Sequence, residues 1–212
     1  MGEHTTQLEF PFEESKPAAV IGLMGRRGSG KDTVAKVAKE LDDSVITLAL
    51  GDFVKHEVAG VTNHSHVWVE AHKEQLRPLL QAWSTEYRRN LCDENYWLSK
   101  LATMLKFIPK ESVVIVTDIR FENEARFIKE CGGVLVRVQR DMPHDDPVDQ
   151  HPSETWVDTC KPDAVLLNDV PTPEQLRKGV EKILEWVLDG TALDGKKLPT
   201  NLSGSKSAGS VN

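Results

Sequence analysis

The sequence has few cysteines, no long apolar run and no excess of positive charge. Its three cysteines are widely spaced and form no Cys-x-x-Cys pair, which argues against a disulfide framework or a zinc site. We therefore expect reduced thiols in a cytoplasmic protein. No apolar run approaches the length of a membrane span, and the polar N-terminus is not typical of a signal peptide. The formal net charge of −7 argues against a general nucleic-acid binder or membrane-surface binder.

The length of 212 residues suits one well-packed domain, and two full domains are not expected. Residues 1–17 are predicted to be a flexible N-terminal extension, because Pro11 and Pro17 limit regular structure there. Residues 191–212 are rich in Gly, Ser and Lys, with almost no apolar content, and are predicted to be a disordered tail. The folded domain is therefore expected over residues 18–190.

A glycine-rich loop lies between a predicted strand at 20–24 and a segment with apolar residues at helical spacing. The spacing Gly25-x-x-x-x-Gly30-Lys31 matches the phosphate-binding P-loop, whose glycines turn backbone N–H groups inward while its lysine adds positive charge. Position 32, normally Ser or Thr, is Asp, and Thr33 follows it. A Gly-rich turn between two core elements is the simpler alternative. The register of strand, glycines, lysine and helix favours the P-loop.

Further short apolar runs are typical of buried strands, and they cover residues 45–50, 113–117, 134–138 and 164–167. Their alternation with helical patterns predicts an α/β fold with a five-stranded parallel sheet. In such sheets ligands bind beyond the carboxyl ends of the strands. The polar residues found there, besides the P-loop, are Asp52, Asp118, Arg120, Arg140, Asn168 and Asp169. We expect one composite site, although polar loops follow strands in many proteins without forming one.

Residues 76–91 carry a strong helical pattern with two faces. The apolar face holds Leu76, Leu80, Trp83 and Tyr87, and the adjacent face holds Arg77, Gln81, Ser84 and Arg88. Periodicity alone does not distinguish the second face from an ordinary solvated one. If Pro78 marks the first helical turn, Arg77 lies at the cap and leaves that face.

Three histidines, His64, His66 and His72, lie in or near a polar stretch. No carboxylate or cysteine completes a recognisable ligand spacing around them. We therefore interpret them as solvated loop histidines.

A P-loop indicates a nucleoside triphosphate and Mg²⁺, but it does not say what receives the phosphoryl group. The chain is short for a motor, and it has no Asn-Lys-x-Asp motif of the GTPase type. A small kinase fits best. A phosphate acceptor is already largely anionic, so positioned cations suffice and no general base is required. The available cations are Arg27, Lys55, Arg88, Arg120 and Arg140, each of which is as readily explained by a surface ion pair.

Five runs occur in a characteristic order. They are Gly-Ser-Gly-Lys-Asp-Thr at 28–33, Arg-Pro-Leu-Leu-Gln-Ala-Trp-Ser-Thr-Glu-Tyr-Arg-Arg at 77–89, Thr-Asp-Ile-Arg-Phe-Glu-Asn-Glu at 117–124, His-Pro-Ser-Glu at 151–154 and Asn-Asp at 168–169. Together they resemble the deoxynucleoside monophosphate kinases of tailed bacteriophages over residues 19–188. Animal phosphomevalonate kinase shares the Gly-Lys-Asp loop and a Trp-x-x-Glu-x-Arg helix, and it is the alternative. A non-catalytic nucleotide-binding regulator is a third hypothesis.

The resemblance implies a three-layer P-loop kinase fold with lid and NMP-binding insertions. It implies transfer of the ATP γ-phosphoryl group to a deoxynucleoside monophosphate, in the host cytoplasm if the chain is phage-encoded. Nucleic acid and membranes are not expected partners, and a homodimer is left open. The residues assigned to ATP are Gly25, Gly28, Ser29, Gly30, Lys31, Asp32 and Thr33, the last two also at Mg²⁺.

The same resemblance assigns acceptor binding to Arg27, Asp52, Lys55, Gln81, Arg88, Asp118 and Arg120. It assigns catalysis to Lys31, Arg120 and Arg140, with Arg120 between the two phosphates and Arg140 at the opening of a lid over ATP. No role is indicated for the run from His151 to Glu154. This interpretation requires Arg88 and Arg120 to lie at the same sheet edge as Lys31.

Overall fold

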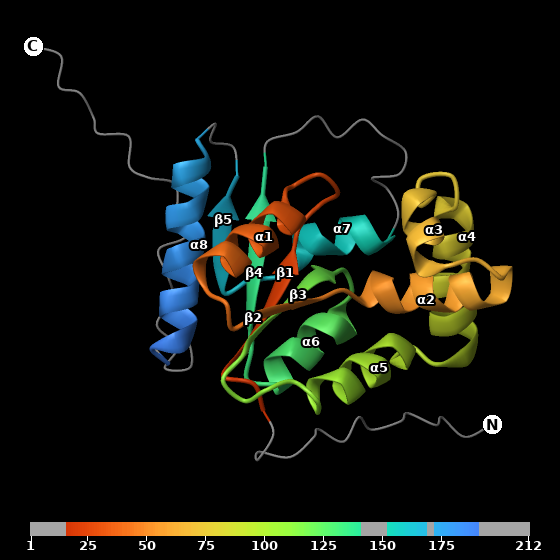
Figure 1. The fold of residues 1–212 in the computed structure, drawn as a ribbon, viewed down its shortest axis with the longest axis horizontal. Coiled ribbons are helices and arrows are strands. Elements are labelled where there is room, and N and C mark those ends of the chain that lie inside the picture. Colours follow the sequence, from red (N-terminus) through yellow and green to blue (C-terminus); the bar gives the residue numbers. More distant parts are fainter. Residues whose placement is uncertain (1–15, 141–151, 169–171, 191–212) are drawn as a thin grey trace, which may run out of the picture.

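The protein is described by a computed structural model over residues 16–140, 152–168 and 172–190 (Figure 1). A five-stranded parallel sheet in the order β2-β3-β1-β4-β5 forms its centre. The strands are β1 (Ala19–Met24), β2 (Val45–Leu48), β3 (Val113–Ile119), β4 (Val134–Gln139) and β5 (Ala164–Leu167). All five predicted strands are confirmed. Strand β2 is shorter than predicted, because the chain enters a helix at Leu50. The predicted tail and nearly all of the predicted extension lie outside the described residues.

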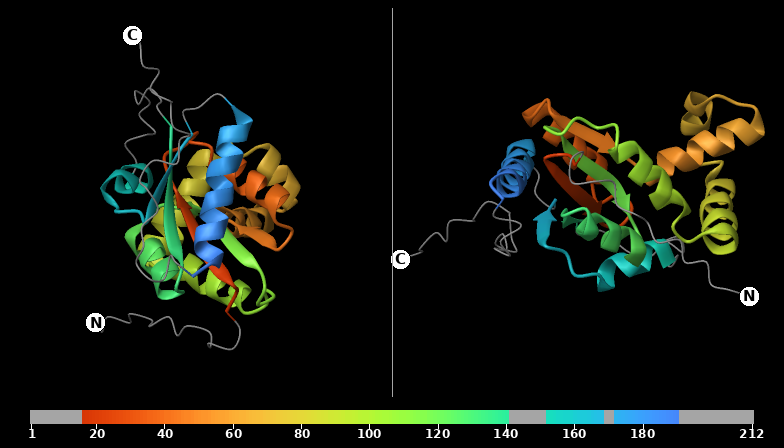
Figure 2. Two further views of the ribbon diagram at one scale, coloured as in Figure 1. Left: turned by 90° about the vertical axis from the view of Figure 1, so that its left-hand side faces the viewer. Right: turned by 90° about the horizontal axis from the view of Figure 1, so that it is seen from below.

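Side chains of the sheet alternate between two hydrophobic cores, one on each face. In β3, Val114 and Val116 belong to one core, and Val113 and Ile115 belong to the other. Both faces are therefore covered, as the continuous β-branched run of a parallel strand predicts. Figure 2 shows α8 on one side of the sheet and α6 and α7 on the other.

Helices α1 (Lys31–Leu41) and α8 (Pro173–Leu188) pack on one face of the sheet. The helices on the other face are α2 (Leu50–Thr62), α5 (Tyr96–Leu105), α6 (Glu122–Glu130) and α7 (Pro152–Thr159). This arrangement confirms the expected three-layer α/β fold.

Between β2 and β3 the chain inserts a helical unit that projects beyond the sheet (Figure 1). It consists of α2, α3 (His66–Ala71), α4 (Arg77–Gln81), the π-helix η2 (Ala82–Cys92) and α5. The helix predicted over residues 76–91 is confirmed in extent, but most of it is a π-helix. Pro78 does lie in the first turn of α4. Helices α2, α3 and α5 have no counterpart among the predicted elements.

The three predicted loop histidines surround a helix instead of lying in a loop. His66 begins α3, and His72 caps its C-terminal end. The rings of His64 and His72 stack on Trp68, at centroid distances of 3.7 and 4.2 Å. The prediction of a loop position is wrong for His66, because Ser65 caps a short helix there, its side chain accepting a hydrogen bond from the backbone N–H of Trp68.

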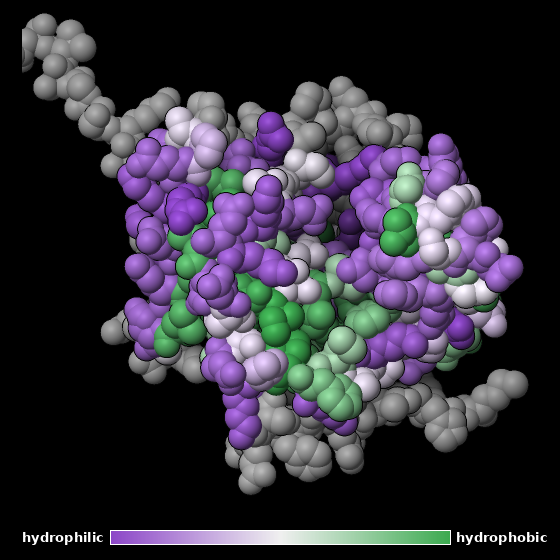
Figure 3. Space-filling model, in the orientation of Figure 1, coloured by the Kyte–Doolittle hydropathy of each residue, from purple (hydrophilic) through white to green (hydrophobic). Residues whose placement is uncertain are grey.

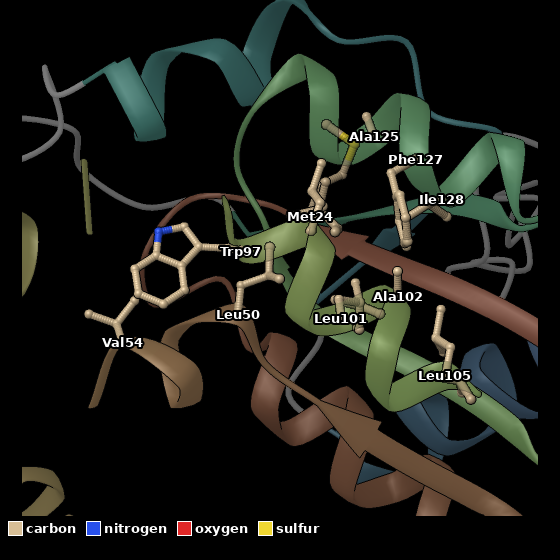
Figure 4. Packing of buried hydrophobic residues seen from close by; sticks show 14 of the residues in the cluster. Met24, Leu50, Val54, Trp97, Leu101, Ala102, Leu105, Ala125, Phe127 and Ile128 are labelled. Carbon is tan, nitrogen blue, oxygen red and sulfur yellow. The ribbon is translucent and has the colours of Figure 1, made fainter. Parts of the chain in front are cut away.

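Tight packing of α5 and α6 against the sheet holds the insertion in place. Phe127 and Ile128 of α6 and Leu101 of α5 are almost fully buried and belong to the core on one face of the sheet (Figure 4). At the far end of α5, the indole of Trp97 lies beside Leu50 and Val54 of α2 (Figure 4). The insertion therefore shares one continuous core with the sheet. Within the described ranges no helix combines the length and apolar composition needed to cross a bilayer.

Gly133, immediately before β4, allows a close backbone approach. A Cβ there would lie 2.6 Å from the carbonyl oxygen of Val20 and 2.8 Å from that of Ile128. We expect Gly133→Ala to lower the free energy of unfolding by about 1–3 kcal/mol, because backbone atoms cannot give way cheaply. Gly60, in α2, is the matched control, since a Cβ there meets no described heavy atom within 4 Å.

Gly60→Ala should raise the free energy of unfolding by up to about 1 kcal/mol through helix propensity. Urea denaturation of both variants measures the difference. Small effects of equal sign in the two variants would contradict the close approach at Gly133.

Candidate active site

The loop between β1 and α1 has the backbone of a phosphate-binding loop. Gly25, Gly28 and Gly30 have φ angles of 151°, 76° and 98°, which side-chain-bearing residues rarely adopt. A Cβ on Gly25 would clash with the carbonyl oxygen of Val138, and one on Gly30 would clash with the amide nitrogen of Asn168. Glycine is therefore required at both ends of the loop, which then opens directly into the N-terminus of α1.

Lys31, the first residue of α1, folds back over this loop. Its Nζ donates to the carbonyl oxygens of Gly25 and Arg26, at 2.6 and 2.9 Å, and lies 3.5 Å from Ser29 Oγ. At the end of β5, Asn168 Nδ2 donates to the carbonyl oxygen of Ser29 at 2.8 Å. The loop is thus braced from the sheet, and a positive charge and a helix N-terminus meet at one place.

A pocket of about 450 Å³ adjoins the loop and extends into the helical insertion. In Figure 3 the surface is hollowed between the part that carries α1 and the part that carries α3 and α4. The cationic residues that line the pocket are Arg27, Lys55, Lys73, Arg77, Arg89 and Arg120, and the carboxyl groups are Asp32, Glu74, Asp118 and Glu124. The uncharged lining residues are Leu50, Gly51, Val54, Leu80, Gln81, Ser84, Thr85, Trp97 and Phe121.

Six of the predicted acceptor or metal residues line this pocket: Arg27, Asp32, Lys55, Gln81, Asp118 and Arg120. They come from the P-loop, α1, α2, α4 and the end of β3, so segments far apart in the sequence do converge at one sheet edge. Arg120 shares the pocket with Arg27 of the P-loop and with Asp32, the residue that follows Lys31.

Two arginines from opposite walls hold a single carboxylate at this pocket. Arg27 Nη2 and Arg77 Nη2 each donate to Glu74, at 3.0 Å. The hydrogen bond from Arg77 is the main cause of the lowered pKa of Glu74. Arg77 therefore stays at the pocket, although it lies at the first position of α4. The spacing of the two guanidiniums suits one anion bound between them.

Lys55 reaches the pocket between two acidic partners. Its Nζ lies 2.5 Å from Asp52 and 2.5 Å from Glu70. Burial lowers the pKa of Lys55, but the hydrogen bonds that Lys55 donates to Asp52 and Glu70, together with the charges of these carboxylates, outweigh burial and raise it. The hydrogen bond from Lys55 is the main reason that the pKa of Glu70 falls to about 2. Asp52 is not among the described residues that line the pocket, and its carboxylate contacts Lys55, which does line it.

Two carboxyl groups of the pocket, those of half-buried Asp118 and buried Glu124, hold helix N-termini. Asp118 accepts hydrogen bonds from the backbone N–H groups of Leu50 and Gly51, at 2.8 and 2.7 Å, where α2 begins. Glu124 accepts from those of Arg120 and Phe121, at 2.7 and 3.1 Å, where α6 begins. Burial raises the pKa of Asp118, and burial together with the charge of Asp118 raises the pKa of Glu124 to about 7.

Arg88 lies elsewhere, so the requirement that it share the sheet edge with Lys31 is not met, and an acceptor site at this pocket has to use the other cations. Its Nε donates to Glu57 at 2.8 Å, and its guanidinium lies over the rings of Trp83 and Tyr96. It is not among the described residues that line the pocket. The reason is the π-helix, whose i→i+5 hydrogen bonds place more residues in each turn than an α-helix does. The α-helical period used for the prediction therefore selected the wrong arginine.

Arg89 takes the place that was predicted for Arg88. Arg77 and Gln81 of α4 and Thr85 and Arg89 of η2 are spaced by four residues, and all four line the pocket. The sequence does contain this four-residue repeat, but nothing in it announces a π-helix. Glu124 was also missed, although it ends the run that supplied Asp118 and Arg120.

The remaining predicted residues give less information. Thr33 is exposed on the first turn of α1, next to Asp32, and it is not among the lining residues. Arg140 is exposed at the end of β4 and also does not line the pocket. The segment that it was predicted to open, His151 included, lies outside the described residues, as does Asp169. The backbone at Glu154 belongs to α7.

The raised pKa of Glu124 makes a prediction about stability. A buried carboxyl group with a pKa of about 7 binds its proton more tightly in the folded chain than in the unfolded chain, where the pKa is 4.5. Its contribution to stability is complete below the unfolded value and is lost as the pH rises through about 7.

Relative to Glu124→Gln, the wild type should therefore lose up to about 3 kcal/mol of unfolding free energy between pH 4.5 and pH 7. Urea denaturation of both proteins at a series of pH values measures the difference. Parallel pH curves would show that Glu124 is ionised throughout this range.

Two sequence comparisons match this chain to kinases. The family model for phosphomevalonate kinase matches residues 23–133. The chain is 31% identical over 179 residues to the "Putative deoxynucleotide monophosphate kinase" of Acanthamoeba polyphaga mimivirus, covering 71% of this chain and 88% of that protein. A solved APS kinase CysC from Mycobacterium tuberculosis, a cysteine-to-alanine mutant, aligns with a TM-score of 0.42 and 17% identity over 80% of this chain and 99% of that one. By its sequence matches the chain belongs to a family of P-loop kinases, the one that the phosphomevalonate kinase model describes.

Proposed function

We propose that this kinase transfers the γ-phosphoryl group of ATP to a deoxynucleoside monophosphate, giving the diphosphate for DNA synthesis in the cytoplasm of a cell or of a phage-infected host. The main support is one observation: the cations of the pocket converge beside the P-loop, and two of them already hold a single anion, the carboxylate of Glu74. The mimivirus relative, which is named as a putative deoxynucleotide monophosphate kinase, supports the same substrate class.

The P-loop supplies the ATP side of the proposed site. Its inward backbone N–H groups, the N-terminus of α1 and Lys31 suit the β- and γ-phosphates. Asp32 and Thr33 offer carboxylate and hydroxyl oxygens, which are the hard donors that Mg²⁺ prefers, so the residues present fit this metal. When bound, Mg²⁺ supplies charge neutralisation on the phosphates.

The pocket supplies the acceptor side. Arg27, Arg77, Arg89 and Arg120 suit the acceptor phosphate, as guanidiniums that can bind it in a bidentate manner. Beyond them the wall carries apolar and aromatic groups, which suit a planar base and a deoxyribose. Polar groups are interspersed along this wall and can bond to the edge of a base; they are Gln81, Ser84 and Thr85.

The proposed reaction needs positioning and positive charge. An oxygen of the acceptor phosphate attacks the γ-phosphorus, a new P–O bond forms, and the bond to the β–γ bridging oxygen breaks, so that ADP leaves. The attacking oxygen carries no proton to remove, and therefore no general base is needed. Lys31 and Arg120, at the boundary between the two halves of the site, are placed to stabilise charge on the transferred group.

Phosphomevalonate is the second candidate acceptor. The observation in its favour is the family model that matches residues 23–133. It also presents a phosphate to the same arginines, but it is acyclic and has no ring to cover the apolar wall of Leu80, Trp97 and Phe121. A non-catalytic regulator is the least supported alternative, because it would not need cations for a second phosphate.

Lys31→Ala tests the ATP half of the site. We expect kcat to fall at least about 100-fold, because a positive charge that acts on the transferred group is removed. The assay is ADP formation with each of the four deoxynucleoside monophosphates, and with phosphomevalonate in parallel. Because Lys31 bonds mainly to its own loop, far-UV circular dichroism should be unchanged. Near wild-type turnover by this variant would rule out the proposed mechanism.

Arg89→Ala and Arg88→Ala form a matched pair at adjacent positions. Arg89→Ala should raise the KM for the acceptor about 10- to 100-fold and leave that for ATP within about twofold, because a charge-assisted bond to the acceptor is lost. Arg88→Ala should instead lower the unfolding free energy by about 1–3 kcal/mol with little change in either KM, since its partner is Glu57. The reverse pattern would contradict the assignment.

A further inference from the structure

Asn123 is a buried polar side chain to which the proposed function gives no role. It lies in the first turn of α6 and is 6% exposed. Its Oδ1 accepts a hydrogen bond from Arg89 Nη2 at 2.7 Å. Its Nδ2 donates to the carbonyl oxygen of Glu94 and to Asn95 Oδ1, both at 2.9 Å. Because Nδ2 faces two acceptors, the amide can turn only its oxygen toward Arg89.

The other contacts of Arg89 also leave its charge largely uncompensated. The guanidinium carbon lies 3.9 Å from the centre of the Phe121 ring, and Nη1 donates to the carbonyl oxygen of Glu94 at 3.2 Å. Its ion-pair partner is Glu124, at 4.0 Å, beyond hydrogen-bond distance. Burial lowers the pKa of Arg89, whereas the pKa of Glu124 is raised to about 7.

In the neighbouring arginine, Arg88, a carboxylate at hydrogen-bond distance compensates the positive charge. Arg88 bonds at 2.8 Å to Glu57, whose pKa is lowered: burial raises it, but the hydrogen bond from Tyr96 and the other bonds to the carboxylate lower it more. The charge of Arg88 is thus neutralised within the protein by the carboxylate of Glu57. Arg89 is held just as firmly, by an amide, a carbonyl and a ring that do not neutralise it. Such a cation favours an anionic ligand at the pocket that it lines.

We infer that Asn123, with Phe121 beneath the guanidinium, is the positioning residue that fixes Arg89 at the acceptor pocket and keeps its charge available to the acceptor phosphate. This inference rests on the proposed function. It also explains why the run that supplies Asp118 and Arg120 continues through Phe121 to Glu124: the same turn that places Arg120 forms the support for Arg89.

Asn123→Ala tests this inference, with Asn95→Ala as the matched control. Asn95 is similarly buried, at 8% exposed, and belongs to the same network, but its side chain bonds to Asn123 and not to Arg89. Both variants should lose some stability. Asn123→Ala alone should raise the KM for the acceptor, by about tenfold, with the KM for ATP unchanged. An equal rise in both variants would overturn the inference, since general loosening would explain it.

A double-mutant cycle tests whether Asn123 acts through Arg89. In the Arg89→Ala background, Asn123→Ala should cause no further rise in the acceptor KM. An additive rise would overturn the inference. If Asn123→Ala does not fold, Phe121→Leu serves in the same cycle, because it keeps apolar volume and removes the ring beneath the guanidinium. Its expected effect is about threefold, likewise absent without Arg89.

Binding of inorganic phosphate, with the P-loop saturated by a non-hydrolysable ATP analogue, separates this inference from the proposed function. Wild type should bind phosphate more tightly than Arg89→Ala and Asn123→Ala, which should be alike. If this holds while none of the tested acceptors is phosphorylated, the proposed function fails and the positioning role stands. If wild type and Arg89→Ala bind phosphate equally, the positioning role is overturned whatever the enzyme phosphorylates.

Discussion

The carboxylate of Glu57 is the interaction on which the helical insertion depends. It comes from α2 and accepts hydrogen bonds from Trp83 and Arg88 of η2 and from Tyr96 of α5, with Lys100 at 3.2 Å. Three helices thus meet at one ionised group. Because its side chain is only 17% exposed, leaving that charge without partners would cost several kcal/mol. The Glu57 network therefore fixes how η2 is rotated, and with it which arginine faces the pocket.

The pocket is in turn a joint between two parts with different roles. The P-loop is braced against the sheet by hydrogen bonds to its backbone, such as the one that the side-chain amide of Asn168 donates to the carbonyl oxygen of Ser29. The insertion is joined to the sheet by the caps that Asp118 provides at α2 and Glu124 provides at α6. Two of the acid groups that line the pocket thus hold helix N-termini, whereas Glu74 bonds to Arg27 and Arg77. Positive charge is therefore concentrated locally at this pocket, although the chain has a net charge of −7.

The two families to which the chain is similar differ in acceptor, and the structure locates where such a difference would arise. In the proposed site, the P-loop, Lys31 and the end of β3 would act on phosphate, which both acceptors share. The wall built by α4, η2 and α5, with Leu80, Thr85 and Trp97 among its lining residues, would contact the rest of the acceptor. Changes of acceptor are therefore expected to involve the insertion and to leave the sheet edge unchanged.

The sequence by itself determined the sheet and the P-loop. Short apolar runs specify buried parallel strands whatever surrounds them, and the glycine spacing requires a backbone that only glycine adopts freely. These features are local, so the five strands and the loop between β1 and α1 were predictable. The convergence of Arg27, Asp118 and Arg120 followed from the rule that parallel strands end at one edge.

Only the tertiary structure decided whether Arg88 or Arg89 lines the pocket. Their order in the chain is fixed, but the face on which each lies depends on the period of the helix, and packing around Glu57 accompanies a π-helix there. Tertiary structure likewise set the roles of Asp118 and Asn123, because a carboxylate or an amide has no role until its partner is known. Those partners lie on other elements, up to 68 residues away for Asp118, and no local pattern records them.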